Sequence, residues 1–339
     1  MTTMNQQILL VSRPSGEPTP ANFRLVSTAL PELLRDQVLV RHHYLSLDPY
    51  MRGRMNDTKN YAKPQALDAV MVGGTVGEVV ASQHAKFAVG DKVVGSGGWQ
   101  EYSVVTAEAA AALRKVDDGA VPLPAYLGAV GMPGVTAWVG MGQIIVPKDG
   151  ETVVVSAASG AVGSAVGQLA KVRGARAVGI AGGAEKCAYV VKELGFDACI
   201  DYKAQRDVGA LIEALDEACP KGVDGYFDNV GGMVLDAVMQ RMNDFGRIAV
   251  CGMISGYNGE VQPMAAPQLI LRSRLKMQGF ICSEYMQLWP PALKELATLV
   301  GSKKLKYRET IANGLASAPE AFIGLLKGHN FGKQLVKLI

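Results

Sequence analysis

Residues 153–167, VVVSAASGAVGSAVG, form the stretch of the sequence that decides the fold. A short apolar run of the kind buried within a sheet comes first, and a cluster of Ala, Ser and Gly follows it. Helical periodicity begins directly after this cluster. The stretch therefore predicts a strand, a tight turn and a helix in immediate succession.

Apolar runs alternate with helical patterns from residue 152 onward, and this rhythm predicts a parallel sheet that is buried on both faces. Right-handed crossovers favour the strand order 3-2-1-4-5-6 of a Rossmann-type doubly wound sheet. We expect strands at 152–156, 175–181, 197–200, 223–229, 246–252 and 275–281, and helices at 160–172, 185–194, 207–218 and 233–242.

The first third of the chain reads differently, since short strands rich in Val and Leu are separated by glycine-containing turns. This pattern predicts a small barrel or a twisted sandwich. The tail carries two further helical patterns and ends in KQLVKLI. We therefore expect an α/β protein with domains at 1–128 and 129–303 and a segment 304–339 that returns to the first, with the early strands at 37–45, 75–81, 91–95 and 99–105 and the late helices at 289–301 and 318–328.

The composition argues against several classes of partner. Lys and Arg are scattered around a net charge of +3, without the basic run that indicates nucleic-acid binding. The five cysteines form no CxxC pair, and the four histidines have no metal-ligand spacing. We expect reduced thiols, no bound metal and a cytoplasmic protein.

One uncharged segment, residues 119–147, is apolar enough to suggest a membrane span. Pro122, Pro124 and Pro133 interrupt it, so no unbroken apolar run approaches the roughly 20 residues that a span requires. The amino-terminal residues also lack the basic leader and long apolar run of a signal peptide. We therefore expect buried helices between 119 and 147 and no membrane association.

The string ASGAVG at 158–163 differs from the dinucleotide-binding pattern G-x-G-x-x-G at its first position. Gly160 and Gly163 keep the second and third glycines, which allow close approach to a pyrophosphate and close helix–strand packing. Ala158 can make the turn if its φ is negative. We expect a cradle at Gly160, Ala161, Val162 and Gly163, with a packing turn that binds no ligand as the alternative.

The tip of the second strand indicates which dinucleotide would bind. NAD sites usually carry a carboxylate there for the ribose 2′-hydroxyl, but counting 22 residues from Gly160 reaches Gly182 and then Gly183. Lys186 follows one turn later, and Tyr202 ends the third strand. This pattern favours NADP(H) over NAD(H), although a solvated helix lysine is the alternative interpretation of Lys186.

Six strings occur together in one order and cover nearly the whole chain: LSLDPYMRGRM (45–55), GMPGVTAW (131–138), ASGAVG (158–163), GIAGGAEKC (179–187), YFDNVGG (226–232) and CGMISGYN (251–258). The chain thereby resembles the zinc-independent medium-chain dehydrogenase/reductases. Within them it is similar to the leukotriene B4 12-hydroxydehydrogenase/prostaglandin reductase branch, with its curcumin-reductase-like and alkenal reductases. The resemblance implies a GroES-like β-rich catalytic domain beside the Rossmann-type domain.

The resemblance also implies which residues contact the cofactor. At the phosphates these are the cradle residues with Lys186 and Tyr202. Further contacts implied in the same way are Thr136, Asn229, Cys251, Gly252, Met253, Ile254, Ser255, Gly256, Tyr257, Phe280, Ile281, Cys282 and Asn330. Zinc-dependent relatives place a Cys where LSLDPYM stands and a Gly-His-Glu near residues 73–79, and neither is present here. We therefore expect chemistry without zinc.

The activity implied by the resemblance is NADPH-dependent reduction of the C=C bond of α,β-unsaturated ketones and aldehydes. Hydride would reach the β-carbon, and Tyr257 and Tyr50 would lie beside the cleft as donors to the enolate oxygen, in competition with the ribose hydroxyl. Both tyrosines could instead be packing residues. Alternatives are an NADPH:quinone oxidoreductase and a dinucleotide-binding protein without turnover. The resemblance also implies a homodimer, with the strand near 275–281 as the candidate sheet edge.

Overall fold

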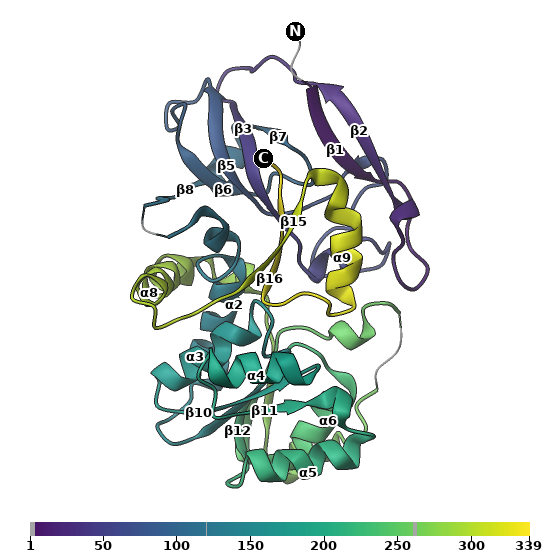
Figure 1. The fold of residues 1–339 in the computed structure, drawn as a ribbon, viewed down its shortest axis with the longest axis vertical. Coiled ribbons are helices and arrows are strands. Elements are labelled where there is room, and N and C mark those ends of the chain that lie inside the picture. Colours follow the sequence, from purple (N-terminus) through teal and green to yellow (C-terminus); the bar gives the residue numbers. More distant parts are fainter. Residues whose placement is uncertain (1–3, 120, 260–262) are drawn as a thin grey trace. The chain divides into compact units, whose positions relative to one another are not determined.

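The computed structural model describes residues 4–119, 121–259 and 263–339 (Figure 1). The chain divides into two compact units. The β-rich unit comprises Met1–Leu127 together with Glu309–Ile339, and the α/β unit comprises Gly128–Arg308. The amino-terminal and carboxy-terminal segments therefore fold together, while the α/β unit is a continuous stretch between them.

The α/β unit is built on a six-stranded sheet in which all the recorded strand pairs are parallel. The order is β11-β10-β9-β12-β13-β14, which confirms the predicted 3-2-1-4-5-6 arrangement. Strand β9, with the continuous apolar run, lies near the centre, and β14 lies at an edge. The bounds are β9 Thr152–Ser156, β10 Arg176–Ala181, β11 Ala198–Asp201, β12 Val223–Asp228, β13 Met242–Val250 and β14 Lys276–Gly279.

Helices cover this sheet and explain why its strands read as unbroken apolar runs. Val154 belongs to the same buried cluster as Leu211 and Leu235 on two of the helices, while the flanking Val153 and Val155 are equally buried. Successive strand residues point to opposite faces, so both faces of β9 are covered. The helices are α2 Met132–Val139, continued by a π-helix at Gly140–Ile145, α3 Gly163–Val172, α4 Ala184–Lys192, α5 Val208–Ala218, α6 Gly232–Arg241, α7 Gln268–Arg272 and α8 Trp289–Gly301.

The β-rich unit contains two mainly antiparallel sheets. The larger runs β15-β16-β3-β5-β6-β8, with β7 also paired to β3, and the smaller runs β2-β1-β4. Trp99 is fully buried and stacks on Phe23 with ring centroids 5.3 Å apart, while Phe322 meets it edge-on. The bounds are β1 Met4–Leu10, β2 Phe23–Ala29, β3 Val38–Ser46, β4 Ala69–Val70, β5 Thr75–Ser82, β6 Lys92–Gly95, β7 Tyr102–Val105, β8 Arg114–Lys115, β15 Glu309–Asn313 and β16 Lys333–Lys337, with helices α1 Tyr50–Arg54 and α9 Ala318–Leu326.

Several predicted boundaries were wrong. The strand expected at 99–105 begins at Tyr102, because Trp99 uses its backbone to bond residues 8 and 71 and its ring to fill the core. The helix expected from residue 160 begins at Gly163, since the residues before it form the turn. Strand β13 ends at Val250, because the next two amides bond back to Asp228. The β1–β2 hairpin was not predicted.

Candidate functional site

The turn after β9 needs glycine at one position for steric reasons. A Cβ added at Gly163 would lie 2.3 Å from the carbonyl oxygen of Ala157, and one at Gly160 would lie 3.1 Å from the same oxygen. Ala157 itself has a φ of 52°. Because a side chain at 163 would collide with backbone, only glycine lets α3 begin this close to the strand.

Ala158 stands where the dinucleotide pattern has its first glycine, and a glycine on the neighbouring strand accommodates it. Its φ is not positive, as the sequence argument required. Its N–H donates to the carbonyl of Ile180 at 3.0 Å. The methyl group lies 2.7 Å from where Gly179 would carry a Cβ, so Gly179 leaves the space that Ala158 occupies. Ala158 can replace glycine in the turn because its neighbour on β10, Gly179, has no side chain.

The predicted cradle would draw its donors from the amino-terminal end of α3. The first backbone N–H groups of a helix have no partner within it, and they carry the positive end of the helix dipole. Val162 is the residue that caps α3, and its side chain makes no capping hydrogen bond. The close approach of backbone at Gly160 and Gly163 fits an anionic diphosphate placed on this turn.

The tips of β10 and β11 are fastened together by one carboxylate. Asp201 Oδ1 accepts from the Gly183 N–H at 2.8 Å and from the Lys203 N–H at 3.0 Å. Gly183 has a φ of 103°, a conformation that glycine adopts without strain. By accepting from both amides, the Asp201 carboxylate holds the residues after β10 close to the residues after β11.

Two side chains that follow β11 lie against Gly182, which follows β10. A Cβ added there would lie 2.9 Å from Tyr202 Cε1 and 3.0 Å from Lys203 Cε, so both side chains lie against the glycine. Burial lowers the pKa of Lys186 and the charge of Lys203 lowers it further, against the opposing charge of Glu185. The charge of Lys203 thus acts on Lys186, and a phosphate dianion bound between two such cations would be stabilised by both.

Lys203 was missing from the residues predicted from the sequence. It follows Tyr202 directly, and the sequence signal that could have indicated it is only this adjacency. Its approach to Lys186 depends on the pairing of β10 with β11, which aligns residue 181 with residue 201. Lys203 is therefore a further candidate beside the predicted pair of Lys186 and Tyr202.

The string YFDNVGG (226–232) ends β12 with a buried carboxylate. Asp228 Oδ1 accepts from the Tyr226 hydroxyl at 2.8 Å, from the amides of residues 230–231 at 3.0 and 2.9 Å, and from Ser156 Oγ at 3.2 Å. Burial raises the pKa of Asp228 against these hydrogen bonds. Asn229 binds the end of β9 through two bonds of 2.8 Å to Ser156. These contacts fix Asn229 at the carboxyl edge of the sheet.

The loop after β13 folds back onto the end of β12. The amides of Cys251 and Gly252 donate to the Asp228 carbonyl at 2.8 and 3.1 Å, and Ser255 Oγ donates to Val230 O at 2.6 Å. The Tyr257 hydroxyl lies 3.0 Å from where a Cβ on Gly252 would be. The absence of a side chain at 252 therefore lets the Tyr257 phenol reach back to the same edge as Asn229.

Two predicted contacts have side chains with other uses. The Phe280 ring meets Phe227 edge-on with centroids 5.9 Å apart, and the residue is 7% exposed, so this side chain belongs to the core. Thr136 Oγ1 donates to the carbonyl of Met132 within α2 at 2.8 Å. Ile281 and Cys282 follow directly as the chain leaves β14, and both are half-buried.

Tyr50 and Asn330 belong to the β-rich unit and are not among the residues that the α/β sheet edge gathers. Tyr50 opens α1 directly after the Asp48-Pro49 pair. Asp48 is buried, accepts from Ser46 Oγ and pairs with Lys333 Nζ at 3.0 Å. Asn330 Nδ2 donates to Gly332 O at 2.8 Å. The segment before Tyr50 is therefore tied to β16 by a buried ion pair.

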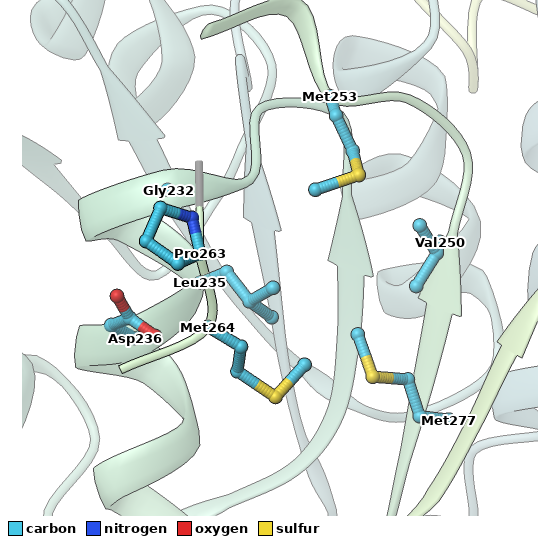
Figure 2. A pocket seen from close by; sticks show the side chains of 8 residues that line it. All are labelled: Gly232, Leu235, Asp236, Val250, Met253, Pro263, Met264 and Met277. Carbon is cyan, nitrogen blue, oxygen red and sulfur yellow. The ribbon is translucent and has the colours of Figure 1, made fainter. Parts of the chain in front are cut away.

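An apolar cavity of about 200 Å³ lies between α6, β13 and β14. Figure 2 shows Met253, Met264 and Met277 around it, with Leu235 and Val250. Its described lining includes no residue of the turn at 160–163, so it is separate from the proposed cradle.

Within residues 4–119, 121–259 and 263–339 no group of three or more His, Cys, Asp or Glu is placed to hold a metal ion. In those same ranges, no helix has the length and apolar character required to cross a bilayer.

Known proteins match this chain over nearly its full length. Residues 6–113 match the family described as the N-terminal domain of oxidoreductase, and residues 161–298 match the family described as zinc-binding dehydrogenase. The chain is 45% identical to the NADPH-dependent curcumin reductase of Escherichia coli, covering 98% of this chain and 97% of that protein. It is 42% identical to the NADP(+)-dependent 2-alkenal reductase of Nicotiana tabacum, again covering 98% and 97%.

A solved structure has the same fold throughout. The crystal structure of CurA from Vibrio vulnificus in complex with NADPH superimposes with a TM-score of 0.91 at 45% sequence identity. The match covers 98% of this chain and 99% of that one. The fold of this chain is therefore shared with that protein over nearly the whole length of both.

Proposed function

The chain belongs to the zinc-independent branch of the medium-chain dehydrogenase/reductase family, and from this premise we propose that it uses NADPH to reduce the C=C bond of α,β-unsaturated ketones and aldehydes. The relatives named as curcumin reductase and 2-alkenal reductase support this substrate class. The observation that supports the proposal is the carboxyl edge of the parallel sheet. The glycine turn at 160–163, the Tyr202 and Lys203 side chains against Gly182, and the Tyr257 hydroxyl against Gly252 all follow the ends of its strands.

NADP(H) fits the residues at this edge. The amides of Ala161, Val162 and Gly163 would take the pyrophosphate at the start of α3. Gly160, whose own N–H donates to Ala157 O at 2.9 Å, would let the backbone approach the phosphates closely. Lys186, Tyr202 and Lys203 would hold the 2′-phosphate, which NAD(H) lacks. The remaining proposed contacts are Thr136, Asn229, residues 251–257, Phe280 through its backbone, Ile281, Cys282 and Asn330.

When bound, reduced nicotinamide supplies a hydride to the β-carbon of the conjugated system. Negative charge then develops on the carbonyl oxygen, and a preplaced hydroxyl donor stabilises it. Tyr257 and Tyr50 are the donors that we propose, since a phenol hydroxyl can donate a hydrogen bond to the developing oxyanion. A proton delivered to the α-carbon from Tyr257 or water completes the saturated product.

The test is NADPH consumption with a panel of enones, enals and quinones, with the organic products identified. The proposal expects turnover with enones and enals and saturated carbonyl products. Turnover with quinones alone would replace it with a quinone reductase, and binding of NADPH without reduction of any acceptor would replace it with a non-catalytic binding protein.

We also propose a homodimer and a cytoplasmic location. Strand β14 is the outermost strand of the parallel sheet, and an unpaired edge can join the same edge of a second copy. The five cysteines are all unbridged, which suits a reducing compartment. Light scattering coupled to gel filtration tests the first proposal, and fractionation of the producing cell tests the second.

A further inference from the structure

Two cysteines outside the proposed hydride-transfer machinery lie in direct contact. Cys187 is in the first half of α4 and Cys199 is on β11, twelve positions later in the sequence, and their sulfur atoms are 3.1 Å apart. A disulfide requires about 2.05 Å, so a movement of roughly 1 Å would join them. Both side chains are partly exposed.

The structure around the pair explains this proximity. Cys199 is aligned with Gly179 on β10, and a Cβ at Gly179 would lie 3.3 Å from the Cys199 sulfur. The missing side chain leaves room for this thiol between the strands and α4. The Cys187 backbone N–H is bonded to Gly183 O at 3.1 Å, so the first turn of α4 holds the partner thiol in place.

The two thiols are chemically unequal. The Cys199 thiol donates to Cys187, which lowers the pKa of Cys187 against burial and the nearby Asp201 carboxylate. The same hydrogen bond, together with burial, raises the pKa of Cys199. Cys187 is therefore the better nucleophile, and Cys199 is placed to attack whatever forms on it.

We propose that a hydroperoxide converts Cys187 and Cys199 into a reversible disulfide, and that this bond weakens NADPH binding at the neighbouring 2′-phosphate site. The Cys187 thiolate attacks one peroxide oxygen and the O–O bond breaks. The attacked oxygen stays on sulfur as a sulfenic acid, and the other leaves as hydroxide or alkoxide and takes up a proton to become water or an alcohol. The Cys199 thiol then attacks that sulfur, an S–S bond forms, and water leaves. The two thiols lose two electrons and two protons, and the peroxide is reduced.

The second half of this proposal rests on the proposed function. Lys186 directly precedes Cys187, and Lys203 lies in the segment that follows β11. Drawing α4 toward β11 by the length needed for the bond would change the spacing of these two cations around Gly182. We expect the disulfide to remove about one charge-assisted contact to the 2′-phosphate. Loss of one such contact should raise KM for NADPH about tenfold.

The experiment uses the purified full-length protein treated with hydrogen peroxide and then alkylated and digested without reductant. Mass spectrometry should find a cross-linked peptide pair joining residues 187 and 199, and dithiothreitol should remove it. Cys187→Ser and Cys199→Ser should abolish it, whereas Cys219→Ala, which removes a buried thiol elsewhere, should retain it. KM for NADPH should rise about tenfold and return on reduction, with KM for NADH unchanged, since NADH has no 2′-phosphate.

Several results would overturn the inference. No 187–199 cross-link, or one between Cys251 and Cys282 in its place, excludes the proposed disulfide. A cross-link that leaves KM for NADPH unchanged excludes the coupling to the cofactor site. If the untreated enzyme shows no preference for NADPH over NADH, the proposed 2′-phosphate site is wrong, while the peptide result still decides whether the disulfide exists.

Discussion

Replacing Lys203 with Met tests whether Lys203 contributes to the proposed 2′-phosphate site. The sequence alone predicted only Lys186 and Tyr202 there. The substitution keeps a long apolar side chain against Gly182 but removes one of the two ammonium groups. Lys203 is exposed, so solvent screening places the lost contact at the weak end of charge-assisted interactions. We expect KM for NADPH to rise about threefold to tenfold, equivalent to roughly 0.7–1.4 kcal/mol.

The same substitution changes the pH dependence in a defined direction. Burial and the charge of Lys203 both lower the pKa of Lys186, so this ammonium group loses its proton at a lower pH than an ordinary lysine. Phosphate binding requires the charged form, and it therefore weakens as pH rises through that lowered pKa. Removing Lys203 removes one cause of the shift, so the alkaline limit of NADPH binding should move to higher pH.

The assay is steady-state KM for NADPH and for NADH across neutral to alkaline pH, for the wild type, Lys203→Met and the control Lys192→Met. Lys192 lies at the other end of α4, and its replacement should leave both constants unchanged. KM for NADH should be unaffected in all three proteins. Equal losses for NADPH and NADH in Lys203→Met, or an alkaline limit that does not move, would refute the assignment of Lys203 to the 2′-phosphate.

Three further predictions concern other parts of the molecule. Gly163→Ala should lower stability by about 1–3 kcal/mol in denaturant unfolding and weaken binding of both dinucleotides, because its Cβ would meet the Ala157 oxygen at 2.3 Å; unchanged stability would contradict this packing. Tyr257→Phe should lower turnover with an enone about a hundredfold with little change in KM for NADPH, whereas Tyr61→Phe should not; full turnover would exclude the Tyr257 phenol as the donor. Burial raises the pKa of Glu309 from 4.5 to about 7 against the charge of Lys333, so the folded protein holds a proton that the unfolded chain releases, and stability should fall as pH rises through that window. Glu309→Gln should make the melting temperature less sensitive to pH between those values, and an unaltered pH profile would exclude this group as the cause.

The architecture of the α/β unit could be predicted from the sequence because it depends on local patterns of apolar residues. Apolar runs such as 152–156, alternating with helices, imply parallel strands, and the handedness of crossovers then fixes their order. The turn at 158–163 was also accessible, since the penalty on a side chain depends on backbone conformation. The β1–β2 hairpin could not be predicted, because its first strand has an apolar run of only three residues, Ile8 to Leu10, and its partner strand is mostly exposed.

The parts of the candidate site that the sequence did not reveal depend on contacts between strands. Lys203 approaches Lys186 only because β10 pairs with β11, and Ala158 is tolerated because Gly179 lies opposite it. The core position of the Phe280 ring likewise follows from its packing on Phe227. Each of these contacts joins residues at least 17 positions apart, and no periodicity reports such a contact.

The central claim is that hydride reaches the β-carbon of a conjugated carbonyl compound, and deuterium transfer tests it most directly. The protein would be given an enone and NADPH carrying deuterium at the transferable position of the nicotinamide, and the product examined by NMR. We predict a saturated ketone with deuterium on the β-carbon and a solvent-derived proton on the α-carbon. An allylic alcohol with deuterium on the former carbonyl carbon would contradict the account.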